Sequence, residues 1–257
     1  MLSVQRPDLL PDPALSREEM EALQREIAAE ASFENDLSFD PAAVTDGPLS
    51  TPGEGPPLVA GVDQAFLDDR AISAIVVSRG GEIVERVYAV SELSIPYIPG
   101  LLSFREGGPI VDAVAELTVE PDLVLFDGSG RIHFREAGLA THMGVVFDVP
   151  SVGVAKSLLC GTPTDTTDNL PEGARVPIEA DADVTAAAGT VIGHAVQTRQ
   201  YDSGNRSINP LIVSPGHRVD ADTAAALVAA LTDGYKLPEP TRRADAYAEE
   251  AKSLFDG

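Results

Sequence analysis

The stretch LVAGVDQAFLDDRAISAIVVSRGGEIVERVYAV, residues 58–90, contains three short apolar runs separated by turn residues. These runs predict strands at 58–63, 71–78 and 82–89, because β-branched and apolar residues bounded by turn signals are typical of strands. Two adjacent glycines between the second and third runs favour a tight hairpin turn. The sequence therefore predicts that the core begins with three consecutive strands, arranged as an antiparallel meander.

Helices and short strands alternate after this meander. Residues 104–117 and 220–231 have the pattern of helices. Further apolar runs that fit buried strands lie at 122–126, 151–155, 190–198 and 211–213. The order of three strands, helix, strand, helix and strand resembles the ribonuclease-H-like fold. We therefore expect an α/β protein with a mixed central sheet and flanking helices, in which the first strand is central and the strand after the first helix lies beside it, parallel.

Two further segments flank the predicted core. Ser16 and Glu19 have the spacing of a capping box, which predicts a helix that begins there and runs to about residue 33. Residues 46–57 are rich in Gly, Pro, Ser and Thr and predict a loop. We divide the chain into an N-terminal segment with a helix and a Pro/Gly-rich stretch (1–57), a ribonuclease-H-like domain (58–237) and an acidic C-terminal tail (238–257). The sequence leaves the helical content of that tail open.

The composition is strongly acidic. The 41 acidic and 18 basic side chains give a formal net charge of −23, and only three of the basic residues are lysines. This charge argues against broad, nonspecific nucleic-acid binding, which usually needs a basic face, but it allows a local, metal-assisted site. Such a surface is typical of proteins that function at high salt, and it predicts a halophilic source.

Other features of the composition narrow the protein class. Cys160 is the single cysteine, so the chain cannot build a disulfide framework or a cysteine-based zinc cluster. No apolar run reaches the roughly 18 residues of a membrane-spanning helix, and the first residues do not have the pattern of a signal peptide. We therefore expect a cytoplasmic protein without membrane contact. We also expect it to act as a monomer.

Two aspartates follow apolar runs that are predicted to be strands. If these strands are parallel neighbours, Asp63 and Asp127 emerge at the same carboxyl edge of the sheet, where open α/β sheets bind ligands. Glu106, early on the intervening helix, could lean over that edge. Three convergent carboxylates repel one another and need a cation, and hard oxygen ligands select Mg²⁺, with Mn²⁺ as a substitute. The pattern predicts phosphodiester hydrolysis, although each acid taken alone is more typical of a turn or a cap.

Six motifs carry a resemblance to a known family. They are GVDQAF (61–66), PYIPGLLSFREG (96–107), LVLFDGSGRIH (123–133), GLATHMGV (138–145), VGVAKSLL (152–159) and VSPGHR (213–218). Together they resemble endonuclease V, over roughly residues 58–232. The resemblance implies a Mg²⁺-dependent DNA repair nuclease that nicks the second phosphodiester bond 3′ to hypoxanthine and leaves 3′-hydroxyl and 5′-phosphate ends. The implied partner is DNA containing deoxyinosine, or inosine-containing RNA.

The resemblance also implies roles for single residues in the chemistry. Asp63, Glu106 and Asp127 match the metal-binding acids of the family. His217 matches a histidine that completes the catalytic edge, and Lys156 matches a lysine near the scissile phosphate. Lys156 is also one of only three lysines in the chain. Because the sequence avoids lysine elsewhere, we expect this one to do more than face the solvent.

Further residues match the lesion-binding part of the family. Tyr97 matches a wedge that enters the duplex beside the lesion, since an aromatic ring can stack on bases that have lost their partners. Gly100, Gly128 and Gly130 resemble glycines that allow the backbone to approach the flipped base. His133, together with Arg135, resembles a His-Pro-Arg stretch in which Phe134 replaces the proline. His142 is expected to be structural, and the acidic insertion 165–183 is expected to be a solvated loop.

Two other hypotheses remain open at this point. The first keeps the fold and the metal but assumes a different nucleic acid, either inosine-containing RNA or a branched or flap structure. The second is a noncatalytic, acidic metal-binding protein, which accounts for the charge but not for Lys156 or Tyr97. Cleavage of an inosine duplex, compared with undamaged and branched duplexes, separates the three hypotheses.

Salt is expected to stabilise the fold and to raise the nicking rate. At a net charge of −23, the acidic side chains of the folded protein repel one another in dilute buffer, and the protein repels DNA. At molar salt the Debye length falls to about 3 Å, which screens distant charges but spares direct contacts in the site. The melting temperature by circular dichroism should rise across a KCl series, and the nicking rate should rise before it falls. Maximal stability and activity in dilute buffer would contradict the halophilic source and leave the nuclease prediction intact.

Overall fold

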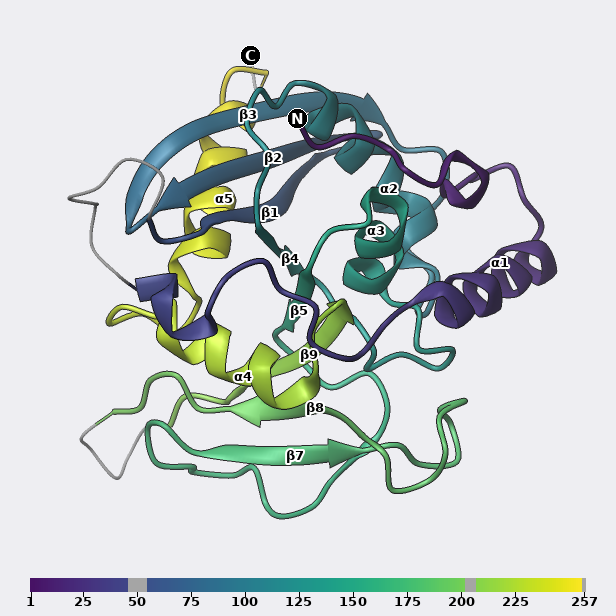
Figure 1. Cartoon of the computed structure of the whole chain (residues 1–257). Coiled ribbons are helices and arrows are strands. Elements are labelled where there is room, and N and C mark those ends of the chain that lie inside the picture. The colour runs from purple at the N-terminus through teal and green to yellow at the C-terminus, as the bar shows by residue number, and fades with distance from the viewer. Residues whose placement is uncertain (46–54, 202–206, 256–257) are drawn as a thin grey trace.

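The computed structural model of the chain describes residues 1–45, 55–201 and 207–255 (Figure 1). The strands are β1 (Leu58–Leu67), β2 (Arg70–Arg79), β3 (Glu82–Glu92), β4 (Leu123–Asp127), β5 (Ser151–Ala155), β6 (Thr162–Pro163), β7 (Arg175–Glu179), β8 (Val191–Val196) and β9 (Leu211–His217). The helices are α1 (Arg17–Glu30), α2 (Leu102–Ala115), α3 (Leu139–Phe147), α4 (Ala221–Ala230) and α5 (Glu239–Lys252), with short 3-10 helices η1 (Pro7–Leu9) and η2 (Pro41–Thr45).

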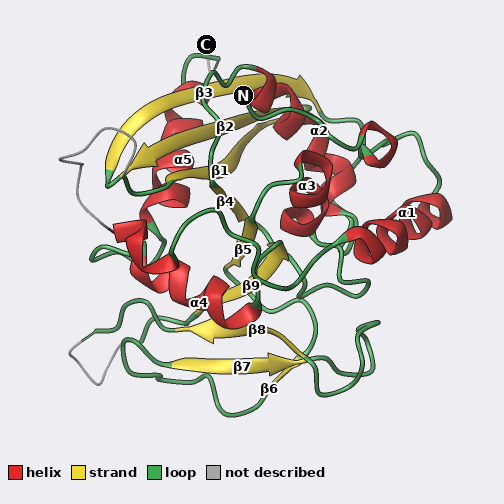
Figure 2. Cartoon of the chain, viewed as in Figure 1, coloured by secondary structure: helices red, strands yellow, loops and turns green. Residues whose placement is uncertain are grey.

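All of these strands belong to one mixed sheet, in the order β3-β2-β1-β4-β5-β9-β8-β7-β6 (Figure 2). β1, β2 and β3 form the predicted antiparallel meander, and β4 and β5 run parallel to β1. Gly80 and Gly81 between β2 and β3 have φ values of 55° and 81°, which a two-residue hairpin turn of the primed type requires. The arrangement confirms the predicted ribonuclease-H-like fold.

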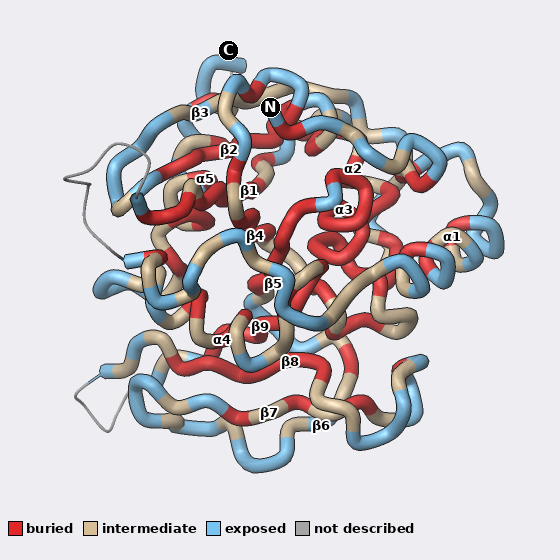
Figure 3. Tube along the Cα trace, viewed as in Figure 1, coloured by how far each residue is buried: buried red, intermediate tan, exposed pale blue. Residues whose placement is uncertain are grey.

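Helices cover both faces of the sheet. Side chains alternate along β1, so Ala60 and Val62 pack with α2 and α3, whereas Val59 packs with α4. Ala65, on the same face as Val59, contacts Ala248 of α5. Helix α3 is buried along its whole length, as the continuous red trace in Figure 3 shows. A helix that lies between a sheet and other helices is buried on every side, so most of its residues are apolar.

The N-terminal segment follows its prediction closely. Ser16 accepts a hydrogen bond from the backbone N–H of Glu19, and the Glu19 carboxylate accepts one from the backbone N–H of Ser16, so the capping box is confirmed. Helix α1 ends at Glu30, slightly before the predicted end. Most of the predicted 46–57 loop, namely 46–54, lies outside the described residues. No helix in the described part of the chain is long and apolar enough to cross a membrane.

Three predicted elements differ from the structure. β1 continues to Leu67, because its long antiparallel pairing with β2 outlasts the parallel pairing with β4, so Asp63 does not end the strand. The predicted strand 211–213 extends to His217 because it pairs with β5 along that length. The insertion 165–183 is not simply a solvated loop, since it contains β7, whose Val176 and Ile178 are buried in a small core beside β8.

The C-terminal residues, whose conformation the sequence left open, form α5. Pro240, Thr241, Ala244, Ala248 and Ala251 are its buried residues. This spacing of small residues lets the helix lie close against β1 and β2. The division of the chain into three parts stays a prediction, but the third part covers the sheet.

A side chain at Gly61 is expected to displace α5. A Cβ atom added there would overlap the backbone of Pro240 and Thr241 at the start of the helix. Gly61→Ala should therefore lower the free energy of unfolding by about 1–3 kcal/mol, the usual cost of overpacking. Gly108→Ala is the control, because it lies inside α2 with open space around it and should be neutral or stabilising by up to about 1 kcal/mol. Urea unfolding at high KCl measures the stability of both variants. Equal stability of Gly61→Ala and the parent would contradict the close packing of α5 against Gly61.

Candidate active site

The parallel pairing of β1 and β4 brings two carboxylates together. The last paired residues are Val62 and Phe126, so Asp63 and Asp127 follow at the same level of the sheet. Alternation turns both side chains toward the face that α4 and α5 cover, because Asp63 shares its side of β1 with Val59. Although Asp63 lies inside β1, the predicted proximity of the two acids is therefore correct.

A cavity of about 450 Å³ opens at this edge of the sheet. The charged residues that line it are Asp63, Glu106, Asp127, Lys156 and Asp245. Glu106 comes from the second turn of α2, as predicted, and is buried. Gln64, on the opposite side of β1 from Asp63, donates a hydrogen bond to the backbone oxygen of Glu106 at 2.9 Å and thereby ties α2 to the strand. Four carboxylates and one ammonium group thus surround one cavity.

Lys156 directly follows β5 and supplies the positive charge of this cavity. Its Nζ donates a hydrogen bond to Asp127 Oδ2 at 2.9 Å. Burial disfavours the charged form, but this hydrogen bond and the charges of Asp127, Asp63 and Asp245 together raise the pKa of Lys156. The ammonium group is therefore held charged beside the carboxylates.

Two of the carboxyl groups are poorly compensated. Burial, followed by the charge of Asp127, raises the pKa of Asp63 to about 8. Burial also raises the pKa of Glu106 to about 7. Asp63 Oδ1 accepts a hydrogen bond from the backbone N–H of Gln64 at 2.7 Å, while Asp63 Oδ2 is buried and has no hydrogen-bond partner among the described residues. A buried anion with an unpaired oxygen atom requires a cation or a proton.

Asp245 on α5 is the site residue that the sequence interpretation missed. Its charge contributes to the pKa values of both Asp63 and Lys156, which shows that it lies near them. The available signal was the alanine spacing at 244, 248 and 251, which predicts a helix that packs on the sheet. On such a helix Asp245 flanks the buried stripe, but only the tertiary structure reveals what this stripe packs against.

The donor set of the cavity fits a hard divalent cation. Carboxylate oxygens are the ligands that Mg²⁺ and Mn²⁺ prefer, and the unpaired Asp63 Oδ2 is one free ligand atom. Within the described ranges, no three His, Cys, Asp or Glu side chains are grouped closely enough to hold one ion in their present positions. Asp127 is instead engaged by Lys156. Chelation of one ion by several of these acids therefore requires side-chain rotation.

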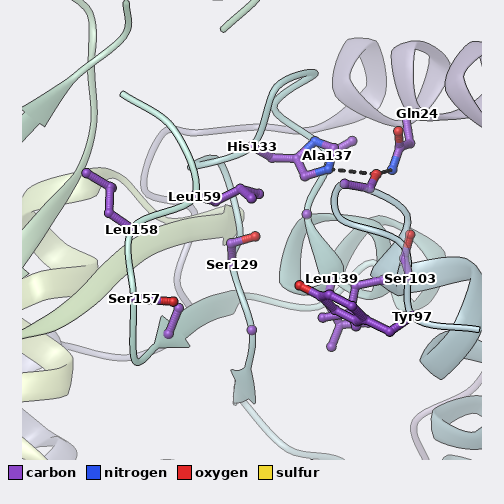
Figure 4. A pocket seen from close by; sticks show the side chains of 15 residues that line it. Gln24, Tyr97, Ser103, Ser129, His133, Ala137, Leu139, Ser157, Leu158 and Leu159 are labelled. Carbon is purple, nitrogen blue, oxygen red and sulfur yellow. Dashed lines mark hydrogen bonds between the residues drawn. The ribbon is translucent and has the colours of Figure 1, made fainter. Parts of the chain in front are cut away.

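A second, smaller pocket of about 160 Å³ adjoins this cavity, and Tyr97, Leu102, Gly128, Leu139 and Ala155 line both (Figure 4). The predicted lesion-binding residues Gly100 and His133 line only the small pocket. Tyr97 is 62% exposed and lies at the rim that the two cavities share. Its ring is therefore not buried in the core but is accessible at this rim.

His133 is a fixed, neutral group in the wall of the small pocket. The backbone N–H of Arg135 donates to His133 Nδ1 at 3.2 Å, so the proton resides on Nε2, which donates to the backbone oxygen of Gly100 at 3.0 Å. Burial lowers the pKa of His133 to about 4, despite the hydrogen bond to Gly100. The His133 imidazole therefore keeps one protonation state, the neutral one, at neutral pH.

His217 does not lie at the catalytic edge, so its predicted position is wrong. β9 runs antiparallel to β5 and pairs His217 with Ser151, at the start of β5, whereas Lys156 follows its end. His217 Nδ1 accepts a hydrogen bond from the backbone N–H of Ser32 at 3.1 Å, and Nε2 donates to Asp148 Oδ1 at 3.2 Å. These contacts fix the N-terminal segment to the opposite end of the sheet.

Gly130 and His142, two other residues singled out in the sequence, make packing and hydrogen-bond contacts within the fold. Gly130 does not line the small pocket among the residues described; a Cβ atom there would overlap the backbone of Pro215 in β9, so the glycine allows close packing of loop and strand. His142 is buried in α3, where its Nε2 lies 2.8 Å from the backbone oxygen of Leu9. This is the kind of structural contact expected of it.

The sheet and the acidic cavity at its carboxyl edge define a nuclease of the ribonuclease-H-like class. The sequence model of the family described as "Endonuclease V" matches residues 48–246. The chain belongs to the endonuclease V family. The endonuclease V of Haloarcula marismortui, a halophilic archaeon, is 64% identical over 265 residues, which cover 98% of each chain.

Solved structures support the same assignment. The crystal structure of endonuclease V from Streptomyces avermitilis has a TM-score of 0.74 and 34% identity, covering 99% of this chain and 100% of that chain. Endonuclease V from Ciona intestinalis, in complex with a 24mer DNA containing an inosine followed by a ribo-adenosine, has a TM-score of 0.71 and 24% identity, covering 93% and 98%. The second likeness shows the shared fold.

Removal of the charge from Asp63 is expected to reduce the pH dependence of stability. Its folded-state pKa of about 8 lies above the value of about 4 in an unfolded chain. A raised pKa stabilises the fold below the unfolded value, and this contribution is lost as the pH rises through the folded value. Between about pH 5 and pH 9, without divalent cations, the melting temperature of Asp63→Asn should therefore fall less than that of the parent.

The matched control for this measurement is Asp168→Asn, at an exposed position, which should follow the parent. Circular-dichroism melts in EDTA at constant KCl report all three proteins. Equal slopes for Asp63→Asn and the parent would show that Asp63 does not ionise in this range.

Proposed function

We propose that this protein is a Mg²⁺-dependent repair nuclease that nicks DNA at the second phosphodiester bond 3′ to deoxyinosine and leaves 3′-hydroxyl and 5′-phosphate ends. The observation that carries the proposal is the junction of two cavities: a small pocket of about 160 Å³ adjoins a cavity lined by four carboxylates and a lysine. The first has the character of a pocket for an extruded base, and the second has the donors needed for phosphodiester hydrolysis.

Asp63, Glu106, Asp127 and Asp245 would hold the divalent cation. When bound, such an ion activates water and neutralises the charge that develops on the phosphate. Mn²⁺ has the same preference for oxygen ligands and is expected to substitute. The raised pKa values of Asp63 and Glu106 imply that a cation replaces protons when it binds, because both compete for the same oxygens.

Lys156 is the group of this cavity that can bind a phosphate directly. The Lys156 side chain is 57% exposed, and its Nζ lies 2.9 Å from Asp127 Oδ2. If Asp127 turns to a cation, Lys156 loses that partner and can donate to a phosphate oxygen instead. One ion pair thus holds the positive charge in position until substrate and metal arrive.

Tyr97 and the small pocket would bind the damaged nucleotide. The exposed ring of Tyr97, at the shared rim, can stack on a base whose partner has left the duplex, an interaction worth about 1–3 kcal/mol. Gly128 lines both cavities and would allow the backbone to approach the extruded base. The flipped nucleotide and the scissile phosphate would thus occupy neighbouring cavities.

The substrate range is the open part of this proposal. The Ciona intestinalis relative was crystallised with an inosine followed by a ribo-adenosine, which favours a test of both sugars after the lesion. Other predictions that accompany the nuclease assignment are action as a monomer and a location in the cytoplasm.

Nicking of a labelled duplex with one deoxyinosine, in Mg²⁺ and high KCl, tests the proposal. We expect one nick at the second phosphodiester bond 3′ to the lesion, and loss of the activity in EDTA. Asp127→Ala and Asp245→Ala should each lower the rate by at least about a hundredfold, because loss of a ligand group weakens metal binding.

Glu249→Ala is the matched control, since Glu249 is an exposed acid on the same helix as Asp245 and should leave the rate unchanged. Undamaged and branched duplexes, inosine-containing RNA and a duplex with a ribonucleotide after the lesion complete the substrate set. Equal cutting of damaged and undamaged DNA would refute lesion specificity. Full Mg²⁺-dependent activity in Asp127→Ala would refute the metal site.

A further inference from the structure

Phe66 is an exposed aromatic side chain of the catalytic cavity that takes no part in the metal and base binding proposed for this region. It lines the cavity of the four carboxylates and is 38% exposed. β1 pairs with β4 only as far as Val62, whereas its pairing with β2 continues through Phe66 to Leu67. The ring therefore lies beyond the point at which Asp63 and Asp127 meet.

Arg105 of α2 supports the ring of Phe66. The guanidinium Cζ lies 5.2 Å from the ring centroid, which makes a cation–π contact. Arg105 Nη1 also donates a hydrogen bond to the backbone oxygen of Ile95 at 2.9 Å, in the loop that carries Tyr97. The two side chains thus form a supported surface at the cavity, with a positive charge next to an aromatic ring.

The order of the strands separates Phe66 from the small pocket. Residues 128 and 129, which follow β4, and residues 157–159, which follow β5, line that pocket. β1 lies on the other side of β4, and Phe66 lines only the larger cavity. A strand with a base in the small pocket and a phosphate at the carboxylates therefore reaches Phe66 only beyond that phosphate.

We propose that Phe66 is a substrate-binding residue whose ring stacks on the nucleotide directly 3′ to the nicked bond, which is the second nucleotide after the lesion. This inference rests on the proposed function, in which the lesion occupies the small pocket and the second phosphodiester bond lies at the carboxylates. The next nucleotide then leaves the acids toward the end of β1. Stacking suits any base, because every base has a π-face, so the contact binds without reading the sequence.

The contact would hold the strand on the far side of the cut. Tyr97 and the small pocket would bind on the 5′ side of the scissile phosphate, and Phe66 on its 3′ side. A phosphate held from both sides keeps its position at the acids, which favours reaction. Unlike attraction between charges, stacking is not screened by salt. This suits a chain whose net charge of −23 provides few basic contacts to DNA.

Single-turnover nicking of a labelled deoxyinosine duplex over a series of enzyme concentrations, in Mg²⁺ and high KCl, tests the inference in the full chain. Phe66→Leu keeps an apolar side chain but removes the aromatic face. It should raise the half-saturating enzyme concentration about tenfold, within the range that stacking on one base contributes. Phe66→Tyr keeps the ring and should restore the parent value.

Phe255→Leu is the matched control. Phe255 is also 38% exposed and also lies beside an arginine, with Arg70 Cζ 5.9 Å from its ring centroid, but it lines neither of the two cavities. This variant should keep the half-saturating concentration of the parent. If Phe66→Leu does not fold, Phe66→Met replaces it as an adaptable apolar side chain without a ring.

A change in the substrate distinguishes stacking from a purely structural role of the ring. An abasic nucleotide directly 3′ to the nicked bond removes the base that Phe66 would contact; only nicks at the second bond after inosine are counted. This duplex should raise the half-saturating concentration of the parent about tenfold, but that of Phe66→Leu no further. With the abasic nucleotide two positions farther along the strand, the tenfold difference between the parent and Phe66→Leu should remain.

The inference would be overturned by a parent-like half-saturating concentration in Phe66→Leu, by failure of Phe66→Tyr to restore it, or by an equal loss in Phe255→Leu. It would also be overturned if the losses from Phe66→Leu and from the abasic nucleotide multiply, because independent effects do not share a contact. Absence of nicking at inosine in the parent would instead refute the proposed function.

Discussion

The short parallel pairing of β1 and β4 is the constraint on which the site depends. It ends at Val62 and Phe126, and the next residue of each strand is an aspartate. The sheet thereby forces two like charges together at a buried edge, where burial and mutual repulsion raise the pKa of Asp63. Lys156, at the end of the next parallel strand, offsets part of this repulsion through Asp127. Unfavourable electrostatics at one edge would be the physical basis for the proposed cation binding there.

The same edge explains how an acidic protein can act on a polyanion. A net charge of −23 repels DNA over most of the surface, so attraction must come from a few local groups. The site concentrates these groups: a charged lysine, carboxylates that favour a divalent cation, and an exposed aromatic ring at the rim. Recognition would then depend on short-range contacts, which molar salt screens only weakly.

The sequence predicted the central strands well because their apolar runs are bounded by clear turn residues, such as Gly80 and Gly81. It also predicted the neighbourhood of Asp63, Glu106, Asp127 and Lys156, since all four follow from strand order and one intervening helix. It failed for His217 because the length and direction of β9 depend on pairing with β5, which no local pattern encodes. Asp245 was missed for the related reason that the packing partner of a helix is a tertiary property.

The position of Asp245 on the last helix has a consequence for synthesis of the protein. Strands β1, β4 and β5 can pair as the chain emerges, since domains commonly fold as their residues become available. Asp245, in contrast, reaches the cavity only when α5 has left the ribosome and docked against Gly61. A nascent chain would carry the sheet and the base pocket but lack one carboxylate of the site. The nuclease would thus stay silent until α5 has docked on the sheet.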